Sequence, residues 1–260
     1  MKVLIFPDAE RADDHVAGLL CQEVAAKPSA VLGLATGGTM ERVYARVVDR
    51  ATAQGLSFRD VTSFNLDEYW RVPPHHPASY AFYMAERMFR PLDMDPGKCH
   101  LPDGLAPDPE DEAERYEAAI VAAGGLDLQL MGLGLNGHIG FNEPTSSFGS
   151  RTRIKTLAES TRTANRPYFD TSDAIPGFAI TMGIQTILEA RQCVLLATGS
   201  AKARAVAAMV EGPMAAICPA SALQMHRCVT VVLDRAAASE LALYDYYQSV
   251  HPDGAPARVP

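Results

Sequence analysis

The stretch LDLQLMGLGLNGHIGFNEP, residues 126–144, indicates both how the chain folds and where its site lies. Residues 126–133 have the length and apolar character of a buried strand. The segment that follows places glycines, the titratable His138, the amides Asn136 and Asn142, and Glu143 in one turn-rich loop. Glycines let a backbone turn sharply and approach a ligand, and a histidine moves protons near neutral pH. We therefore predict a site at the end of a central strand.

Short apolar runs alternate with helical patterns along the whole chain. The runs predicted to be strands are residues 3–6, 30–35, 61–65, 126–133, 193–197 and 229–233. The predicted helices are residues 9–26, 39–53, 79–89, 108–123, 183–190, 200–211 and 236–249. This alternation predicts one α/β domain over residues 1–260, a single doubly wound, mostly parallel, Rossmann-like sheet with helices on both faces. Residues 145–178 are polar and irregular, and we expect a lid over the site within them.

Composition narrows the class of protein. The chain has 260 residues, 48% of them hydrophobic, and a net charge of -8. This charge argues against a general affinity for nucleic acid or an anionic membrane, but leaves anionic small molecules open. No apolar run is long enough to span a bilayer, and the N-terminus does not resemble a secretory signal. Five scattered cysteines without a CxxC pair indicate reduced thiols, so we expect a cytoplasmic protein without disulfides or zinc.

Four polar loops follow predicted strands. They are residues 36–39, 66–70, 134–143 and 198–202. In doubly wound folds, ligands bind at the carboxyl ends of the strands. We therefore expect these loops to meet at one edge of the sheet.

Two of these loops are candidates for binding an anion. TGGT at residues 36–39 offers hydroxyls and glycine N–H groups at a helix N-terminus. Lys202 lies in the first turn of the helix after residues 198–199, where a bound anion would offset its unfavourable position on the helix dipole. Each feature alone could be an ordinary turn or a surface lysine. Residues 132–137 fit GxGxxG by letter, but a polar loop follows, so a nucleotide site is rejected.

Two groups of residues are candidates for proton transfer. Asp67 and Glu68 follow the strand at 61–65, where one could act as a general base or the two could cap a turn. Asp67 is the better candidate because it is nearer the strand. His138 with Glu143 could be a base and the group that orients it, or a hydrogen-bonded structural loop. No HxxxH pair or Cys/His cluster supports a metal site.

Five motifs together resemble the glucosamine-6-phosphate deaminase family. They are TGGT at 36–39, FNLDEY at 64–69, GLNGHIGFNEP at 134–144, SRTRIKTL at 150–157 and GSAKA at 199–203. Their order and spacing cover nearly the whole chain, and the pairing of GHIGFNEP with FNLDEY is specific. The 6-phosphogluconolactonases share the fold and the glycine loops, but the chain is less similar to them.

The resemblance implies conversion of glucosamine 6-phosphate and water to fructose 6-phosphate and ammonia, without metal or organic cofactor. His138 would open the sugar ring with Glu143 behind it, and Asp67 would move a proton from C2 to C1. The aldose would thereby become an enolamine and then an imine, which water hydrolyses. The residues implied to bind the phosphate are Gly37, Gly38, Thr39, Lys202 and Arg166.

The chain departs from the family pattern at two positions. Asn136 stands where some members have an aspartate, and an amide there can still orient His138. Pro167 stands where the family usually has an arginine, so either Arg166 or Arg162 is expected to contact the phosphate.

Regulation and alternative functions stay open. Ser146, Arg153 and Lys155 match an allosteric site for N-acetylglucosamine 6-phosphate in hexameric members, but unregulated members keep similar residues. A hexamer and a monomer are therefore both compatible with the sequence. The alternatives are a 6-phosphogluconolactonase-like hydrolase, which would not need Asp67, and a non-catalytic sugar-phosphate sensor. No basic helix-turn-helix precedes the first strand, which speaks against the sensor.

Overall fold

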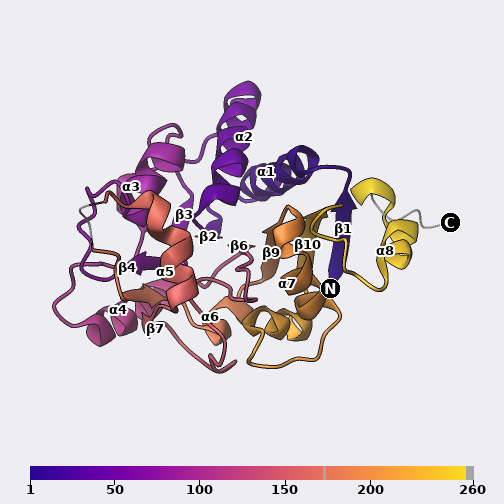
Figure 1. Ribbon diagram of the computed structural model, residues 1–260. Helices are drawn as coiled ribbons and strands as arrows, with labels where there is room; N and C mark the ends of the chain where they lie inside the picture. Colours follow the sequence, from indigo (N-terminus) through magenta and orange to yellow (C-terminus); the bar gives the residue numbers. More distant parts are fainter. Residues whose placement is uncertain (172–173, 256–260) are drawn as a thin grey trace.

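The computed structural model describes residues 1–171 and 174–255 and is built on a seven-stranded parallel sheet. The strand order is β1-β10-β9-β6-β2-β3-β5 (Figure 1). The strands are β1 (Lys2–Phe6), β2 (Val31–Leu34), β3 (Thr62–Asn65), β5 (Cys99–His100), β6 (Leu128–Gly132), β9 (Gln192–Ala197) and β10 (Val229–Asp234). Apolar runs buried on both faces are typical of parallel sheets. The predicted sheet and its six strands are confirmed, and the two-residue edge strand β5 was not predicted.

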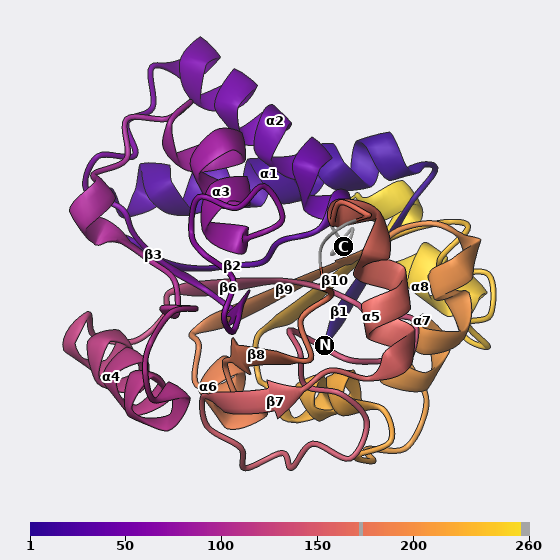
Figure 2. The ribbon, with the colours of Figure 1, turned by 60° about the vertical axis from the view of Figure 1, so that its left-hand side comes forward.

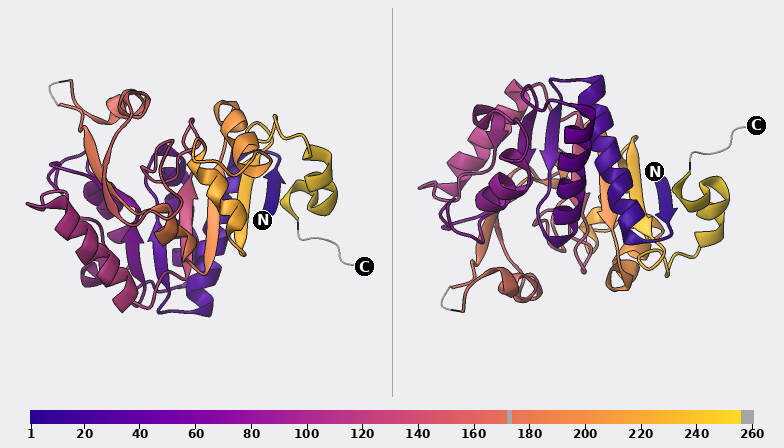
Figure 3. Two further views of the ribbon diagram at one scale, coloured as in Figure 1. Left: turned by 90° about the horizontal axis from the view of Figure 1, so that it is seen from below. Right: turned by 90° about the horizontal axis from the view of Figure 1, so that it is seen from above.

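Helices cover both faces of this sheet, as predicted. The α-helices in the described part of the chain are α1 (Ala9–Ala26), α2 (Gly38–Gln54), α3 (Tyr80–Met84), α4 (Pro109–Ala122), α5 (Glu159–Asn165), α6 (Ile184–Leu188), α7 (Ala203–Val210) and α8 (Tyr244–Val250). Figure 3 shows α1 and α2 in front of the sheet from above, and α7 in front of it from below. A π-helical turn at Ala85–Phe89 extends α3 to the predicted end.

The predicted helix over residues 236–249 is wrong in its first half, because α8 begins only at Tyr244. Residues 236–243 consist mainly of turns, and three of their N–H groups bond to carboxylates. Asp234 accepts a 2.7 Å hydrogen bond from the N–H of Ala237, and Glu211 accepts from Ala242 and Leu243. Side-chain acceptors of this kind compete with helical hydrogen bonds.

A second, three-stranded antiparallel sheet lies beside the first. Its order is β4 (Asp67–Tyr69), β8 (Phe178–Thr181) and β7 (Arg153–Thr156). The sequence did not predict this sheet, and residues 145–178, expected to be irregular, contain β7 and α5. Residues 172–173 of that segment lie outside the described residues. The register pairs Asp67 with Thr181, which fixes the end of β4 against β8.

The strand order reverses between β2 and β6, and this reversal positions the site. After β2 the chain adds β3 and β5 toward one edge of the sheet. After β6 it adds β9 and β10 toward the opposite edge. The loops after β2 and β6 therefore diverge and leave a crevice at the carboxyl ends of the strands. The helix α5 lies at the end of the sheet rather than on either face (Figures 2 and 3).

Among the described residues, no helix combines the length and the apolar character needed to cross a membrane.

Candidate active site

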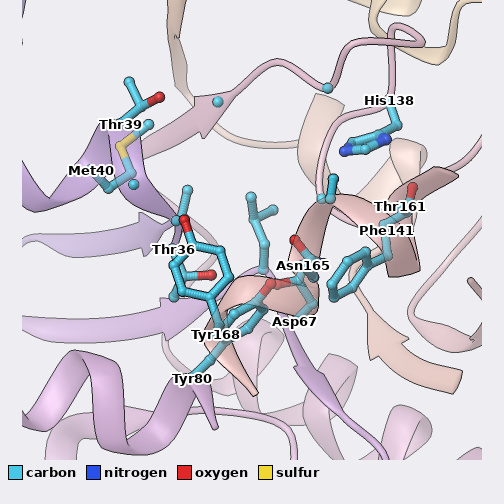
Figure 4. Close-up of a pocket in the computed structure, with 18 of the residues that line it drawn as sticks. Thr36, Thr39, Met40, Asp67, Tyr80, His138, Phe141, Thr161, Asn165 and Tyr168 are labelled. Carbon is cyan, nitrogen blue, oxygen red and sulfur yellow. The ribbon is translucent and has the colours of Figure 1, made fainter. Parts of the chain in front are cut away.

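A cavity of about 500 Å³ opens at the carboxyl ends of the central strands. This volume is within the range of small-molecule sites. All four loops expected at this edge line the cavity, which confirms that they meet there. Figure 4 shows Thr36 and Thr39 on one side of the cavity, His138 and Thr161 on the other, and Asp67 between them.

Asp67 begins β4 and faces the cavity with only 5% of its surface exposed. Burial raises the pKa of Asp67 to about 8, and the neighbouring Glu68 adds to the effect. Thr181 opposes the shift, since its hydroxyl donates to Asp67 Oδ2 at 3.5 Å. A base works best when its pKa is near the working pH. Asp67 is therefore suited to take up and release a proton on carbon.

Glu68, next to Asp67, is occupied by backbone contacts. Its carboxylate accepts hydrogen bonds of 2.8–3.0 Å from the N–H groups of Tyr69, Tyr80 and Ala81. Glu68 thus caps the first turn of α3, which was the alternative considered for this pair. Asp67 remains the carboxylate that lines the cavity.

His138 and Glu143 lie together in the loop after β6. The Nδ1 atom of His138 is 3.5 Å from Glu143 Oε2. Asn136 connects the two, because its Nδ2 donates to Glu143 Oε2 at 2.7 Å and its Oδ1 accepts the backbone N–H of His138 at 3.2 Å. The amide therefore holds the Glu143 carboxylate and the backbone of His138 together, and its role in orienting the imidazole stays a prediction.

Glu143 remains ionised despite being buried. Burial disfavours its charge, but the adjacent His138 and the hydrogen bonds from Thr161 and Asn136 together lower the pKa of Glu143 to about 2. The hydroxyl of Thr161 donates to the second carboxylate oxygen, Oε1. A carboxylate with permanent charge behind a histidine stabilises the imidazolium.

Glycines allow this loop to pack closely on the side chains of His138 and Asp67. A Cβ atom on Gly134 would lie 2.4 Å from ring atoms of His138. Gly140 has φ 55°, and a Cβ atom there would come within 3.1 Å of Asp67 Oδ2. Two of the loop glycines are thus required by the approach of His138 and Asp67.

The other end of the cavity is suited to an anion. The helix α2 begins at Gly38, and Gly37, Gly38 and Thr39 line the cavity at its N-terminus, where N–H groups are free to bind anions. Lys202 reaches the cavity from the turn after β9, and its Nζ donates to the carbonyl of Leu133 at 2.6 Å. Burial lowers the pKa of Lys202.

The two arginines expected to compete for the phosphate do not line the cavity in the described part of the chain. Arg166 follows α5 and donates to the carbonyl of Thr171 at 3.0 Å, and Arg162 pairs with Glu159 at 3.0 Å. Their contact with phosphate stays a prediction.

The residues matched to an allosteric site lie away from the cavity lining. Arg153 and Lys155 stand two residues apart on β7 and so share one face of it. Arg153 donates to Asn142 Oδ1 at 3.0 Å. Ser146 is buried, and its N–H bonds to the carbonyl of Glu143. A regulatory role for these residues stays a prediction.

Four residues at the site were not predicted from the sequence. Three line the cavity, namely Thr161 and Tyr168 from the segment around α5 and Tyr80 from α3. The fourth, Thr181 on β8, contacts Asp67. Only Thr181 had a recognisable pattern, since the run FAIT between Gly177 and Gly183 fits a short strand.

Nothing in the described residues groups three or more side chains that could hold a metal ion. The five cysteines are free thiols.

Known proteins resemble this chain over nearly its whole length. Residues 8–232 match the family model described as glucosamine-6-phosphate isomerases/6-phosphogluconolactonase. A glucosamine-6-phosphate deaminase from Rhodopirellula baltica is 52% identical over 241 residues, which are 93% of this chain and 96% of the relative. A protein of the same name from Streptomyces coelicolor is 48% identical over 252 residues, which are 96% of this chain and 97% of the relative.

Solved structures are also similar to this chain. A structure described as a monomeric glucosamine-6-phosphate deaminase has a TM-score of 0.90 and 46% identity, covering 92% of this chain and 100% of that one. A 6-phosphogluconolactonase from Trypanosoma brucei has a TM-score of 0.73 at 20% identity, covering 93% and 98%, and thus shares the fold.

Proposed function

Because this chain belongs to the family of glucosamine-6-phosphate isomerases and 6-phosphogluconolactonases, as its motifs predicted, we propose that it deaminates glucosamine 6-phosphate. The products are fructose 6-phosphate and ammonia, and water is the second substrate. The reaction couples an aldose–ketose isomerisation to hydrolysis of a C–N bond. Two relatives named glucosamine-6-phosphate deaminase support the assignment, because each is about 50% identical to this chain over nearly its full length.

The sugar phosphate has a natural orientation in the cavity. Its phosphate faces the N-terminus of α2 and Lys202, where N–H groups and a cation converge. The sugar carbons then extend toward Asp67 and His138. Holding the phosphate in this way presents C1 and C2 to the reacting groups, which lowers the barrier by proximity.

His138 opens the ring in this scheme. Its Nδ1 side faces Glu143, so the opposite nitrogen is available to move the proton between the C1 hydroxyl and the ring oxygen. Glu143 is ionised and fixed by Asn136, so it stabilises the charge that His138 acquires. The distance of 3.5 Å between the two is compatible with a bond that shortens when substrate binds.

The observation that carries the proposal is Asp67, a buried carboxyl at the centre of the cavity. It takes the proton from C2 of the open aldose and returns it to C1. The electrons of the broken C2–H bond form the C1–C2 double bond of an enolamine, while the π electrons of the C1 carbonyl move to O1, which takes up a proton from water. Protonation at C1 then shifts the double bond to C2 and the amino nitrogen and gives a protonated imine at C2. Water adds to the imine and ammonia leaves. Chemistry of this kind uses side chains alone, so we propose that neither metal nor organic cofactor takes part.

The lactonase alternative is not favoured. Hydrolysis of a lactone needs a water-activating group and a phosphate seat, but no base at C2. Asp67, which accepts a hydrogen bond from Thr181, would have no chemical role in that reaction.

One experiment separates the two functions. Purified protein is given saturating glucosamine 6-phosphate, with ammonia and fructose 6-phosphate measured, and in parallel 6-phosphogluconolactone, with hydrolysis measured above the spontaneous rate. We expect ammonia and fructose 6-phosphate in equal amounts and no enhanced lactone hydrolysis. Folded protein that hydrolyses the lactone and releases no ammonia would exclude the deaminase. The same activity after dialysis against EDTA would support the absence of a metal.

A further inference from the structure

The helix α5 is tied to the catalytic pair through one side chain. Thr161 is the buried residue among the seven of α5, all of which the structure describes. Its hydroxyl donates to Oε1 of Glu143, the carboxylate whose Oε2 faces His138. Both partners are nearly inaccessible to water, with 6% and 5% of their surfaces exposed.

A helix of seven residues has little stability of its own. The N-cap of α5, Ala158, offers no side-chain hydrogen bond. The segment is held at its flanks by Leu157 and Phe169, which are buried in the small core beside Tyr69. Between these anchors, Thr161 supplies the contact that joins α5 to the loop after β6.

The helix α5 and the turn after it cover the cavity with one face. The residues of this face line the cavity and recur at helical spacing; they are Ser160, Thr161, Ala164, Asn165 and Tyr168. Tyr168 reaches the opposite side, because a Cβ atom on Gly38 would lie 3.2 Å from its hydroxyl. The segment therefore spans the cavity from Glu143 to the N-terminus of α2, as Figure 4 shows for Thr161 and Tyr168.

We propose that Thr161 is a positioning residue that makes ring opening depend on the seating of α5 over the substrate. Its hydroxyl fixes Oε1 of Glu143 while Asn136 fixes Oε2, so the carboxylate plane is set and His138 is aimed at the sugar. When α5 lifts, Glu143 loses one of its donors and the pair loses its orientation. Ring opening is thereby confined to a covered site.

This inference rests on the proposed deaminase activity and adds a prediction of its own. Thr161→Val keeps the shape and β-branching of the side chain but removes the donor. Loss of a hydrogen bond to a charged group lowers kcat on glucosamine 6-phosphate by about ten- to a hundredfold. The affinity for 2-amino-2-deoxyglucitol 6-phosphate, the reduced and permanently open-chain form of the substrate, changes less than about threefold, because neither phosphate seat nor Asp67 is altered.

Two further variants make the test specific. Thr161→Ser restores the hydroxyl and should recover most of kcat. Thr163→Val makes the same change on an exposed residue of α5 and should leave both kcat and inhibitor affinity at wild-type values.

The outcomes are distinct. If wild-type protein releases no ammonia, the proposed function fails and this inference with it. If the wild type is active and Thr161→Val matches it in kcat, or loses inhibitor affinity as strongly as kcat, the positioning role is overturned. Failure of Thr161→Ser to recover kcat overturns it as well.

Discussion

Asp67 and Thr181 lie opposite each other in an antiparallel ladder, and the Thr181 hydroxyl donates to Asp67 Oδ2 at 3.5 Å. The same hydroxyl accepts the N–H of Phe141 at 3.1 Å. One threonine thus joins the proposed C2 base to the loop that carries His138. The small antiparallel sheet is therefore part of the active site.

The first prediction concerns pH. Asp67 must be ionised to accept a proton, and burial raises its pKa to about 8, so kcat/KM should rise with pH and level off above about pH 8. Thr181→Val removes the donor that favours the ionised form, so the rising limb should move to higher pH. The measurement is kcat/KM from roughly pH 6 to 10. Thr230→Val, on β10, is the control and should leave the limb in place. A limb that stays fixed or moves to lower pH in Thr181→Val would argue against Asp67 as the base.

The second prediction concerns ring opening. His138→Gln keeps a hydrogen-bonding side chain but cannot carry a proton, so kcat/KM on glucosamine 6-phosphate should fall by about 10²–10⁴. Binding of 2-amino-2-deoxyglucitol 6-phosphate, which is already open, should change little. Steady-state rates and inhibition constants measure the two effects. An equal loss in both would contradict a role confined to the ring.

The third prediction concerns the phosphate seat. Lys202→Met removes the cation at the cavity, so KM should rise by a factor that corresponds to about 1.5–3 kcal/mol, roughly ten- to more than a hundredfold. The control is Lys98→Met, because Lys98 pairs with Asp60 at the surface. Initial rates over a wide substrate range give KM for both variants. If Lys202→Met lowers kcat while KM stays the same, Lys202 acts in chemistry rather than in binding.

The fourth prediction concerns stability. The pKa of Asp67 is raised from 3.8 to about 8 in the folded chain, so between these values the folded state holds a proton that the unfolded state has released. Wild-type stability therefore loses a contribution as pH rises through this window. Asparagine cannot ionise, so Asp67→Asn should gain in Tm relative to wild type as pH rises from roughly 4 to 8. Glu68, whose pKa is also raised, is present in both proteins. A Tm difference that does not change with pH would contradict the raised pKa.

Much of the fold was predictable because its strands are local apolar runs. The six predicted strands of the parallel sheet and the four loops at its edge follow from residues close in sequence. Asp67, His138 and Glu143 were found because glycines and titratable groups stand together after those strands.

The rest depends on contacts between distant segments. The strand β4 pairs with β8 more than a hundred residues later, so their sheet could not be predicted from either run alone, although the run of β8 by itself fits a short strand. Thr161 reaches Glu143 only because α5 turns back over the cavity. The directions in which the side chains of Arg162 and Arg166 point depend on how that segment packs in the fold. They do not follow from where the two residues stand in the sequence.

The most direct test of the account is the Asp67→Asn variant, followed by solvent-proton exchange and ammonia release. Wild-type protein in D₂O should release ammonia from glucosamine 6-phosphate and form fructose 6-phosphate that carries deuterium at C1 in the fraction of turnovers in which the proton on Asp67 exchanges with solvent before it is transferred to C1. The variant should remain folded, bind the open-chain inhibitor nearly as well, and show neither ammonia release nor exchange above background. Ammonia release by the variant at a rate near that of the wild type would contradict the assignment of Asp67 as the base at C2.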